Sequence, residues 1–323
     1  MNSYYIHEEN YAAEMKETVE PYLAARMRDF SYSGKDGAKI YAARYDADEP
    51  KGSIVLAHGF TESVEKYREM IYYFLNAGYS VAACDFRGHG RSAREVEHPR
   101  LTHIGKFETY VSDFSILCDK VEEQMPHPIF LFSHSMGGAV SSLLMEQRPS
   151  FFRAAVLSSP MIAPARYGLP YWVANLVTGL PRCLGLGKQM PGKISDHFDD
   201  GGYAAACGTS EARYRYYSDL RRADERFHTI HPTFSWTNEA LHVTKKVLKK
   251  GEPEKIAAPV LLFSADGEEV VLVKEQKDFI ARVPGGELCE VKDSKHEVYM
   301  SHDDVLFPYL EKILAFYEEN LAK

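Results

Sequence analysis

Short apolar runs separated by amphipathic stretches recur along most of this chain. A run of about four to eight apolar residues bounded by turn residues predicts a buried strand, because such a strand is covered on both faces. Runs of this kind lie at residues 53–57, 81–84, 129–132, 154–158 and 260–263, and a further strand is expected at 287–291. Their alternation with helical stretches predicts parallel βαβ units, so we expect an α/β fold with one doubly wound, mostly parallel sheet.

Helix-like spacing, with apolar residues three and four positions apart, lies between these runs. It predicts helices at residues 67–78, 104–124, 273–280 and 305–321. Residues 30–46 instead show two alternating runs around Gly-Lys-Asp-Gly, which predicts a β-hairpin. Residues 7–28 have helix-like spacing interrupted by Pro21, and we expect a short helix lying on the body.

The regular alternation stops at Pro160 and resumes only in the last quarter of the chain. The intervening segment holds several prolines and then helix-like stretches rich in Tyr and Arg, which predicts an inserted, mainly helical cap. We therefore expect a helical extension at 1–29, a first core segment at 30–160, the cap at 161–245 and a second core segment at 246–323.

Composition and charge narrow the class of protein. The chain has 323 residues, of which 45% are hydrophobic, and can bury a large core. A net charge of −8 without a long basic tract argues against nucleic acid as a main partner. Five scattered cysteines without a Cys-x-x-Cys pair suit a reducing compartment and predict neither a disulfide framework nor a zinc site. Because no signal peptide or spanning run is recognisable, we expect a cytoplasmic protein.

One stretch carries the candidate chemistry. The apolar run 129–132 precedes Ser-His-Ser-Met-Gly-Gly at residues 133–138, and helical spacing follows. A strand that turns sharply into a helix at a Ser flanked by small residues is the context of a nucleophile elbow. Gly137 and Gly138 fit this pattern, whereas Ser133 stands where Gly is usual. Ser135 is therefore the candidate nucleophile, and the alternative is an ordinary Gly-rich turn.

A Ser nucleophile needs a base, an acid that orients the base, and hydrogen-bond donors for the oxyanion. The expected chain order is Ser, acid and then His. His296 follows the last predicted strand and is the candidate base, with His302 as its nearest rival. The expected oxyanion donors are the backbone N–H groups of Met136 and of Phe60, which follows a His-Gly turn. Acid candidates after the preceding strand are Asp266, Glu268 and Glu269.

Together these motifs resemble the α/β-hydrolase fold. The resemblance rests on His-Gly-Phe at 58–60, Asp-x-Arg-Gly-His-Gly-x-Ser at 85–92 and the elbow motif. Within that fold the chain looks like the monoacylglycerol lipase and bacterial lysophospholipase branch, and its cap sequences at 213–217 and 231–236 look more like the lysophospholipase. The resemblance implies a serine carboxylester hydrolase that cleaves a single-chain glycerolipid through an acyl-enzyme, without metal or organic cofactor.

The family pattern also chooses among the acids. In that pattern a Pro opens the strand, and the acid is followed by one variable and two apolar residues. Counting back from Val270-Val271 and forward from Pro259 both lead to Glu268. Asp266 remains the alternative acid, although Asp-Gly at this point also suits the turn that lifts the acid toward His296.

The predicted cap begins with a stretch that is both apolar and basic. Residues 161–195 contain neither Asp nor Glu, but they hold four cations among many apolar side chains: Arg166, Arg182, Lys188 and Lys193. Such a face predicts peripheral contact with an anionic membrane surface, here the inner face of the membrane. The alternative is that the apolar side chains pack the cap onto the body.

Other functions stay open at this point. The same serine chemistry serves aminopeptidases and acyltransferases on this fold, and a catalytically inactive hydrolase fold can act as a lipid-binding module. An intact set of Ser135, His296 and a nearby acid favours an enzyme. Head-group preference, acyl-chain length and oligomeric state are not indicated by any pattern in the chain.

Overall fold

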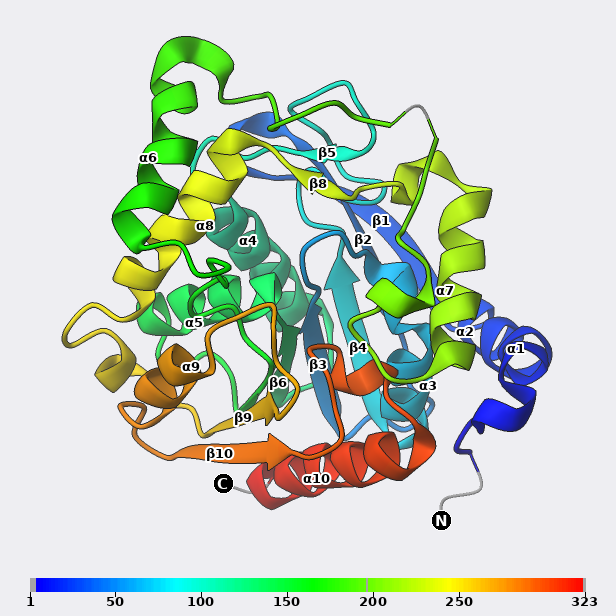
Figure 1. Cartoon of the computed structure of the whole chain (residues 1–323). Coiled ribbons are helices and arrows are strands. Elements are labelled where there is room, and N and C mark those ends of the chain that lie inside the picture. The colour runs from blue at the N-terminus through cyan, green and yellow to red at the C-terminus, as the bar shows by residue number, and fades with distance from the viewer. Residues whose placement is uncertain (1–3, 196, 322–323) are drawn as a thin grey trace.

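A mostly parallel sheet forms the centre of the computed structural model, which describes residues 4–195 and 197–321. In that part of the chain the sheet has eight strands in the order β1-β2-β4-β3-β6-β7-β9-β10 (Figure 1). The strands are β1 Met27–Ser33, β2 Lys39–Tyr45, β3 Gly52–Ala57, β4 Tyr79–Cys84, β6 Ile129–His134, β7 Ala155–Ser158, β9 Val260–Ala265 and β10 Gly286–Val291. The predicted doubly wound sheet is confirmed.

Alternate side chains of the central strands enter two separate cores. Val55 and Ala57 of β3 pack into one core together with residues of four helices: α4 Glu108–Gln124, α5 Met136–Gln147, α8 Phe234–Val247 and α9 Val273–Ile280. Ile54 and Leu56 face the opposite core, formed with α3 Arg68–Asn76, α10 Asp303–Leu321 and the N-terminal helices. Both faces of the central strands are therefore covered, which explains why β3, β4, β6, β7 and β9 are mostly apolar and fully buried, whereas the edge strands β1 and β10 carry exposed polar residues.

A helical extension and then a β-hairpin come before the parallel strands. β1 and β2 pair antiparallel, and the turn between them places Asp36 and Gly37 at φ 62° and 79°. The extension consists of three short helical segments in succession. They are α1 Tyr11–Glu14, a π-helical turn Met15–Val19 and α2 Glu20–Ala24. The helical path continues past Pro21, unlike the expected interruption, because Pro21 lies at the start of α2, where a missing N–H is tolerated.

One predicted helix begins later than expected. α4 starts at Glu108 rather than near residue 104. Ile104 is fully buried, but it lies in a loop after β5 Leu101–Thr102, which pairs in parallel with β8 His231–Pro232. The apolar side chain of Ile104 therefore contributes to the core without belonging to the helix that follows it.

Between β7 and β9 the chain leaves the sheet. This stretch contains α6 Tyr171–Pro181, α7 Glu211–Ala223 and α8, and Figure 1 shows α6 at its outer end. α8 packs on α5 and into the core, and α7 contacts α1. These helices lie in the segment 161–245 for which a cap was predicted, except that α8 extends to Val247. Of the helices in the described part of the chain, none combines the length and apolar character needed to cross a bilayer.

Candidate active site

The candidate nucleophile lies at a sharp turn between a strand and a helix. β6 ends at His134, α5 begins at Met136, and Ser135 between them has φ 48° and ψ −116°. A positive φ is strained for a residue with a side chain and persists only where the surroundings hold it. Here the Ser135 N–H donates to the Ser158 carbonyl at 3.1 Å, and the Ser135 carbonyl accepts from Met161 N–H at 2.8 Å.

The small residues of the elbow are needed for close packing. A Cβ on Gly137 would lie 2.3 Å from the carbonyl oxygen of Ala57, and one on Gly138 would lie 2.5 Å from Cβ of Pro160. Both glycines therefore let α5 approach β3 and the loop after β7. Ser133, where Gly is usual, is buried within β6, and its hydroxyl donates to the Val156 carbonyl at 3.4 Å, so the larger side chain is accommodated.

A continuous chain of hydrogen bonds joins three of the predicted residues. His296 Nε2 lies 2.8 Å from Ser135 Oγ, and His296 Nδ1 lies 2.8 Å from Glu268 Oε2. Because a carboxylate only accepts, Nδ1 carries the proton and Nε2 is free to accept the Ser135 proton. The three side chains come from the loops that follow β6, β9 and β10, at the carboxyl ends of the strands, where ligands of open α/β sheets bind.

The environment of Glu268 favours its ionised form. Burial alone would raise the pKa of this carboxyl. The hydrogen bond from His296 and those from the N–H groups of Val270 and Val271, at 2.8 and 3.2 Å, outweigh burial and leave the pKa of Glu268 below its ordinary value. At neutral pH the group is therefore a carboxylate that can stabilise a protonated His296.

Asp266, the alternative acid, faces a different partner. Its two carboxylate oxygens accept the backbone N–H groups of Asp293 and Ser294, each at 3.1 Å. The hydrogen bond from Ser294 is the main reason that the pKa of Asp266 lies below its ordinary value. Asp266 thus holds the loop that carries His296 without contacting the imidazole. Glu269 and His302 also lie outside the hydrogen-bonded chain, and His302 contacts Glu8.

The two predicted oxyanion donors are available. Met136 N–H lies at the first turn of α5, and Phe60 follows β3 on a loop that Trp236 covers, with ring centroids 4.0 Å apart. Across residues 4–195 and 197–321, neither the Met136 nor the Phe60 N–H has a hydrogen-bond acceptor. Gly137 packs against Ala57 and His58, which brings the start of α5 next to this loop.

Four charged or titratable residues beside the site were not selected from the sequence as functional. They are Glu62, Lys66, His134 and Glu297. The His134 and His296 rings have centroids 4.8 Å apart. Burial lowers the pKa of His134 to about 3, so its imidazole is neutral. In the sequence, only the four-residue spacing of Glu62 and Lys66 after the His-Gly turn pointed to an ion pair here. The same spacing is common on exposed helices, so it did not indicate a functional role.

Comparison with known proteins identifies the family. The model of the family described as serine aminopeptidase, S33 (Hydrolase_4) matches residues 48–303, well over half of the chain. The chain belongs to this family. The resemblance predicted from the sequence motifs is thereby confirmed, and so is the α/β-hydrolase fold.

Individual relatives of this family member are lipid hydrolases by name. Lysophospholipase L2 of Escherichia coli K12 is 27% identical over 319 residues, covering 91% of this chain and 89% of the relative. A monoacylglycerol lipase of Mycolicibacterium smegmatis is 30% identical over 167 residues, covering 49% and 58%. The crystal structure of Paleococcus ferrophilus monoacylglycerol lipase superposes with a TM-score of 0.67 at 22% identity, covering 87% of this chain and 99% of the other.

Proposed function

We propose that this ester hydrolase cleaves the acyl ester of a single-chain glycerolipid, a lysophospholipid or a monoacylglycerol, through an acyl-enzyme on Ser135. The observation that carries the proposal is the unbroken hydrogen-bond chain from Ser135 Oγ through His296 to Glu268. Names of the relatives support the lipid substrate, since lysophospholipase and monoacylglycerol lipase are both among them.

The geometry supports a two-step acyl transfer. Ser135 Oγ attacks the ester carbonyl while His296 Nε2 takes its proton, and Glu268 stabilises the resulting imidazolium. The imidazolium then gives this proton to the leaving alcohol as the C–O bond breaks. In the second step a water molecule gives a proton to His296 and attacks the carbonyl of the acyl-enzyme. His296 then gives this proton to Ser135 Oγ as the bond between the acyl carbon and Oγ breaks, which releases the fatty acid and restores Ser135. The N–H groups of Met136 and Phe60 stabilise the oxyanion in both steps.

A small cavity next to the site, lined by a mixture of polar and apolar side chains, suits the alcohol part of such a substrate. It has a volume of about 170 Å³ and is lined by Thr61 and Glu297, the neighbours in sequence of Phe60 and His296. Cap residues including Asp200, Tyr214 and Arg221 line its other side. Charged and hydroxyl groups in a small cavity favour a polar glycerol or glycerophosphate moiety over a second acyl chain.

We also infer that the cap touches a membrane through a surface we call the cap patch. The cap patch consists of exposed apolar side chains on and around α6: Tyr167, Leu169, Trp172, Leu176, Val177, Leu180, Leu184 and Leu186. Within α6 only Ala174 and Thr178 are buried, so most of its apolar side chains face solvent rather than the body. Exposed Lys188 and Lys193 follow, and the surrounding segment lacks acidic residues, which suits anionic lipid.

A hydrolysis panel on the purified protein tests the proposed substrate class. It compares lysophosphatidyl lipids, monoacylglycerols, short p-nitrophenyl esters and aminoacyl arylamides. We expect kcat/KM to be highest for one of the two glycerolipids. Turnover of arylamides alone would favour an aminopeptidase, acyl transfer to an added alcohol would favour a transferase, and binding of lipid without any turnover would favour an inactive lipid-binding module.

A further inference from the structure

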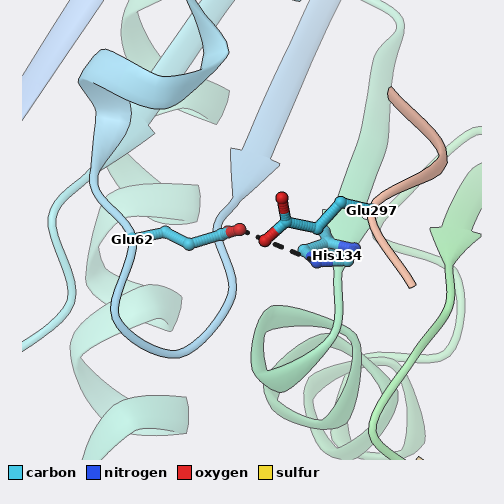
Figure 2. Close-up of side chains that lie close together, drawn as sticks. All are labelled: Glu62, His134 and Glu297. Atoms are coloured by element: carbon cyan, nitrogen blue, oxygen red, sulfur yellow. Dashed lines mark ion pairs between the residues drawn. The ribbon is translucent and has the colours of Figure 1, made fainter. Parts of the chain in front are cut away.

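A second buried polar cluster lies directly beside the hydrogen-bond chain of Ser135. Figure 2 shows the carboxylates of Glu62 and Glu297 converging with the ring of His134, and His134 Nε2 lies 3.7 Å from Glu62 Oε1. One ligand atom of each residue lies within 4.8 Å of the others, a spacing that can suit a metal ion. However, the Lys66 ammonium is 2.9 Å from Glu62 and 2.5 Å from Glu297, so the two carboxylates already share a cation.

Glu62 is held more tightly than a simple ion pair requires. Its Oε2 accepts from Gly59 N–H at 2.5 Å and from the Tyr67 hydroxyl at 2.6 Å. Its Oε1 accepts from Lys66 and from the Tyr299 hydroxyl, the latter at 2.6 Å. Burial alone would raise the pKa of Glu62, but Lys66 and the hydroxyls of Tyr299 and Tyr67 outweigh burial and hold the pKa well below its usual range. The carboxylate is therefore ionised and fixed.

One of these bonds acts on the loop that carries an oxyanion donor. Gly59 immediately precedes Phe60, and a Cβ on Gly59 would lie 2.8 Å from Glu62 Oε2. The carboxylate thus packs against the Gly59 peptide and fixes its N–H. Glycine is a mobile backbone position, so the direction of the next N–H, that of Phe60, depends on two anchors: this contact with Glu62 and the hydrogen bond that His58 Nδ1 donates to the Gly59 carbonyl at 2.7 Å. Thr61 adds strain, since its φ is 64°.

The same cluster reaches the loop of the candidate base. Glu297 follows His296 directly, and its carboxylate binds Lys66. The Glu297 N–H also donates to the Cys207 carbonyl of the cap at 2.8 Å. Lys66 therefore links the Phe60 loop to the His296 loop. Its charge also offsets that of Glu62, which would otherwise oppose a developing oxyanion nearby.

We propose that Glu62 is a positioning residue for oxyanion stabilisation. It fixes the Gly59 peptide so that the Phe60 N–H points at the oxyanion. Through Lys66 and Glu297 it also holds the loop of Phe60 at a fixed position relative to the loop of His296. The proposal rests on the proposed serine esterase function, but it does not depend on which acyl ester is the natural substrate.

Glu62→Gln tests the proposal with a short p-nitrophenyl ester. The amide keeps the shape but loses the charge and one of the two acceptor oxygens. Because loss of a whole oxyanion donor typically costs about 10²–10³ in kcat, we expect a misdirected donor to lower kcat by about 10- to 100-fold. KM should change by less than about threefold, and the inhibition constant of an arylboronic acid should rise by the factor by which kcat/KM falls.

Glu69→Gln is the matched control. Glu69 on α3 is also buried, accepts from the Tyr11 and Tyr73 hydroxyls at 2.8 and 2.6 Å, and pairs with a buried cation, Arg213. It faces the N-terminal segment instead of the Phe60 loop, so its loss should lower Tm while kcat and boronate affinity stay unchanged. A merely structural role for Glu62 would give the same result in both variants.

Several outcomes would overturn the proposal. The proposal fails if folded Glu62→Gln has the kcat of the wild type, or if this substitution changes only KM. It also fails if Glu69→Gln lowers kcat by the same factor as Glu62→Gln. If Glu62→Gln does not fold, Glu297→Gln takes its place, and we expect a several-fold loss of kcat with a matching loss of boronate affinity, because only the Lys66 link is weakened. Wild-type protein that cleaves p-nitrophenyl esters but no glycerolipid would reject the substrate class alone, whereas protein inert to all esters and to fluorophosphonate would reject both proposals.

Discussion

Glu268 and Asp266 lie two residues apart on the loop after β9, but their carboxylates bind different partners. Glu268 Oε2 is 2.8 Å from His296 Nδ1, whereas Asp266 accepts two backbone N–H groups from the loop that carries His296. One carboxylate orients the imidazole and the other fixes the backbone around it. The proposed roles of the two acids can therefore be separated by neutral isosteres.

Glu268→Gln should lower kcat by about 10²–10⁴-fold, because the amide neither stabilises the imidazolium nor enforces the right tautomer of His296. Asp266→Asn keeps one acceptor oxygen for the loop and should lower kcat by less than about tenfold. Steady-state kinetics on a p-nitrophenyl ester, with thermal melts to establish folding, makes the comparison. The reverse ranking in stably folded variants would make Asp266 the acid.

Ser135→Ala should lower ester hydrolysis by about 10³-fold or more with little change in Tm, because it removes one oxygen from a turn that the backbone holds. A fluorophosphonate probe should label the wild type at Ser135 and leave the variant unlabelled, as mass spectrometry of the modified peptide would show. Persistent labelling of Ser135→Ala would point to another nucleophile.

The cap patch should bind anionic vesicles in a salt-sensitive manner. Replacing Trp172 and Leu184, which are 69% and 67% exposed, by Ser should weaken binding about tenfold or more, because both side chains lose apolar area that would enter the lipid. Co-sedimentation with vesicles that contain phosphatidylglycerol measures the effect. Met27→Ser, at an exposed apolar position on β1, is the control. No sedimentation of wild-type protein at low salt would reject membrane contact and leave the hydrolase proposal intact.

The raised pKa of Glu146 should make the protein less stable at alkaline pH. Burial and the nearby Glu252 raise the pKa of this α5 carboxyl to about 8, although Lys255 and Arg282 oppose the shift. The folded state binds the proton of Glu146 more tightly than the unfolded chain does. The contribution of Glu146 to the unfolding free energy is therefore largest below about pH 4.5 and falls as pH rises toward 8. Because water and nearby charges screen this group, we expect its contribution to the unfolding free energy to fall by only about 2 kcal/mol over this range.

Glu146→Gln should remove this dependence. The variant should match the wild type near pH 5 and exceed its unfolding free energy at pH 9, as urea titrations across the range would measure. The isolated Oε1 supports this expectation, because within the described residues it has no hydrogen-bond partner although it is buried. Glu123→Gln, at an exposed position, is the control and should not alter the pH profile. Identical profiles for wild type and Glu146→Gln would contradict the prediction.

The strands could be predicted because both sheet faces are covered, so Ile54 and Val55 are both apolar although they enter different cores. The elbow and the candidate base were recognisable from local sequence and chain order. The Glu62 cluster was not, because its burial depends on Tyr299 and Glu297, which lie far away in the sequence. Arg213 is a similar case: it is fully buried only because Glu69 and Asp303 from distant helices surround it.

The elbow glycines have an evolutionary consequence. Gly137 and Gly138 are excluded from carrying a Cβ by neighbouring atoms, whereas Ser135 is a non-glycine residue held at positive φ. In a neutral-drift library selected for folding alone, both glycines should persist, but position 135 should change, with glycine enriched because it relieves the strain. Selection for turnover would add the requirement for serine. Sequencing the two libraries would thus separate, within one hexapeptide, the residues that shape the scaffold from the residue that carries the reaction.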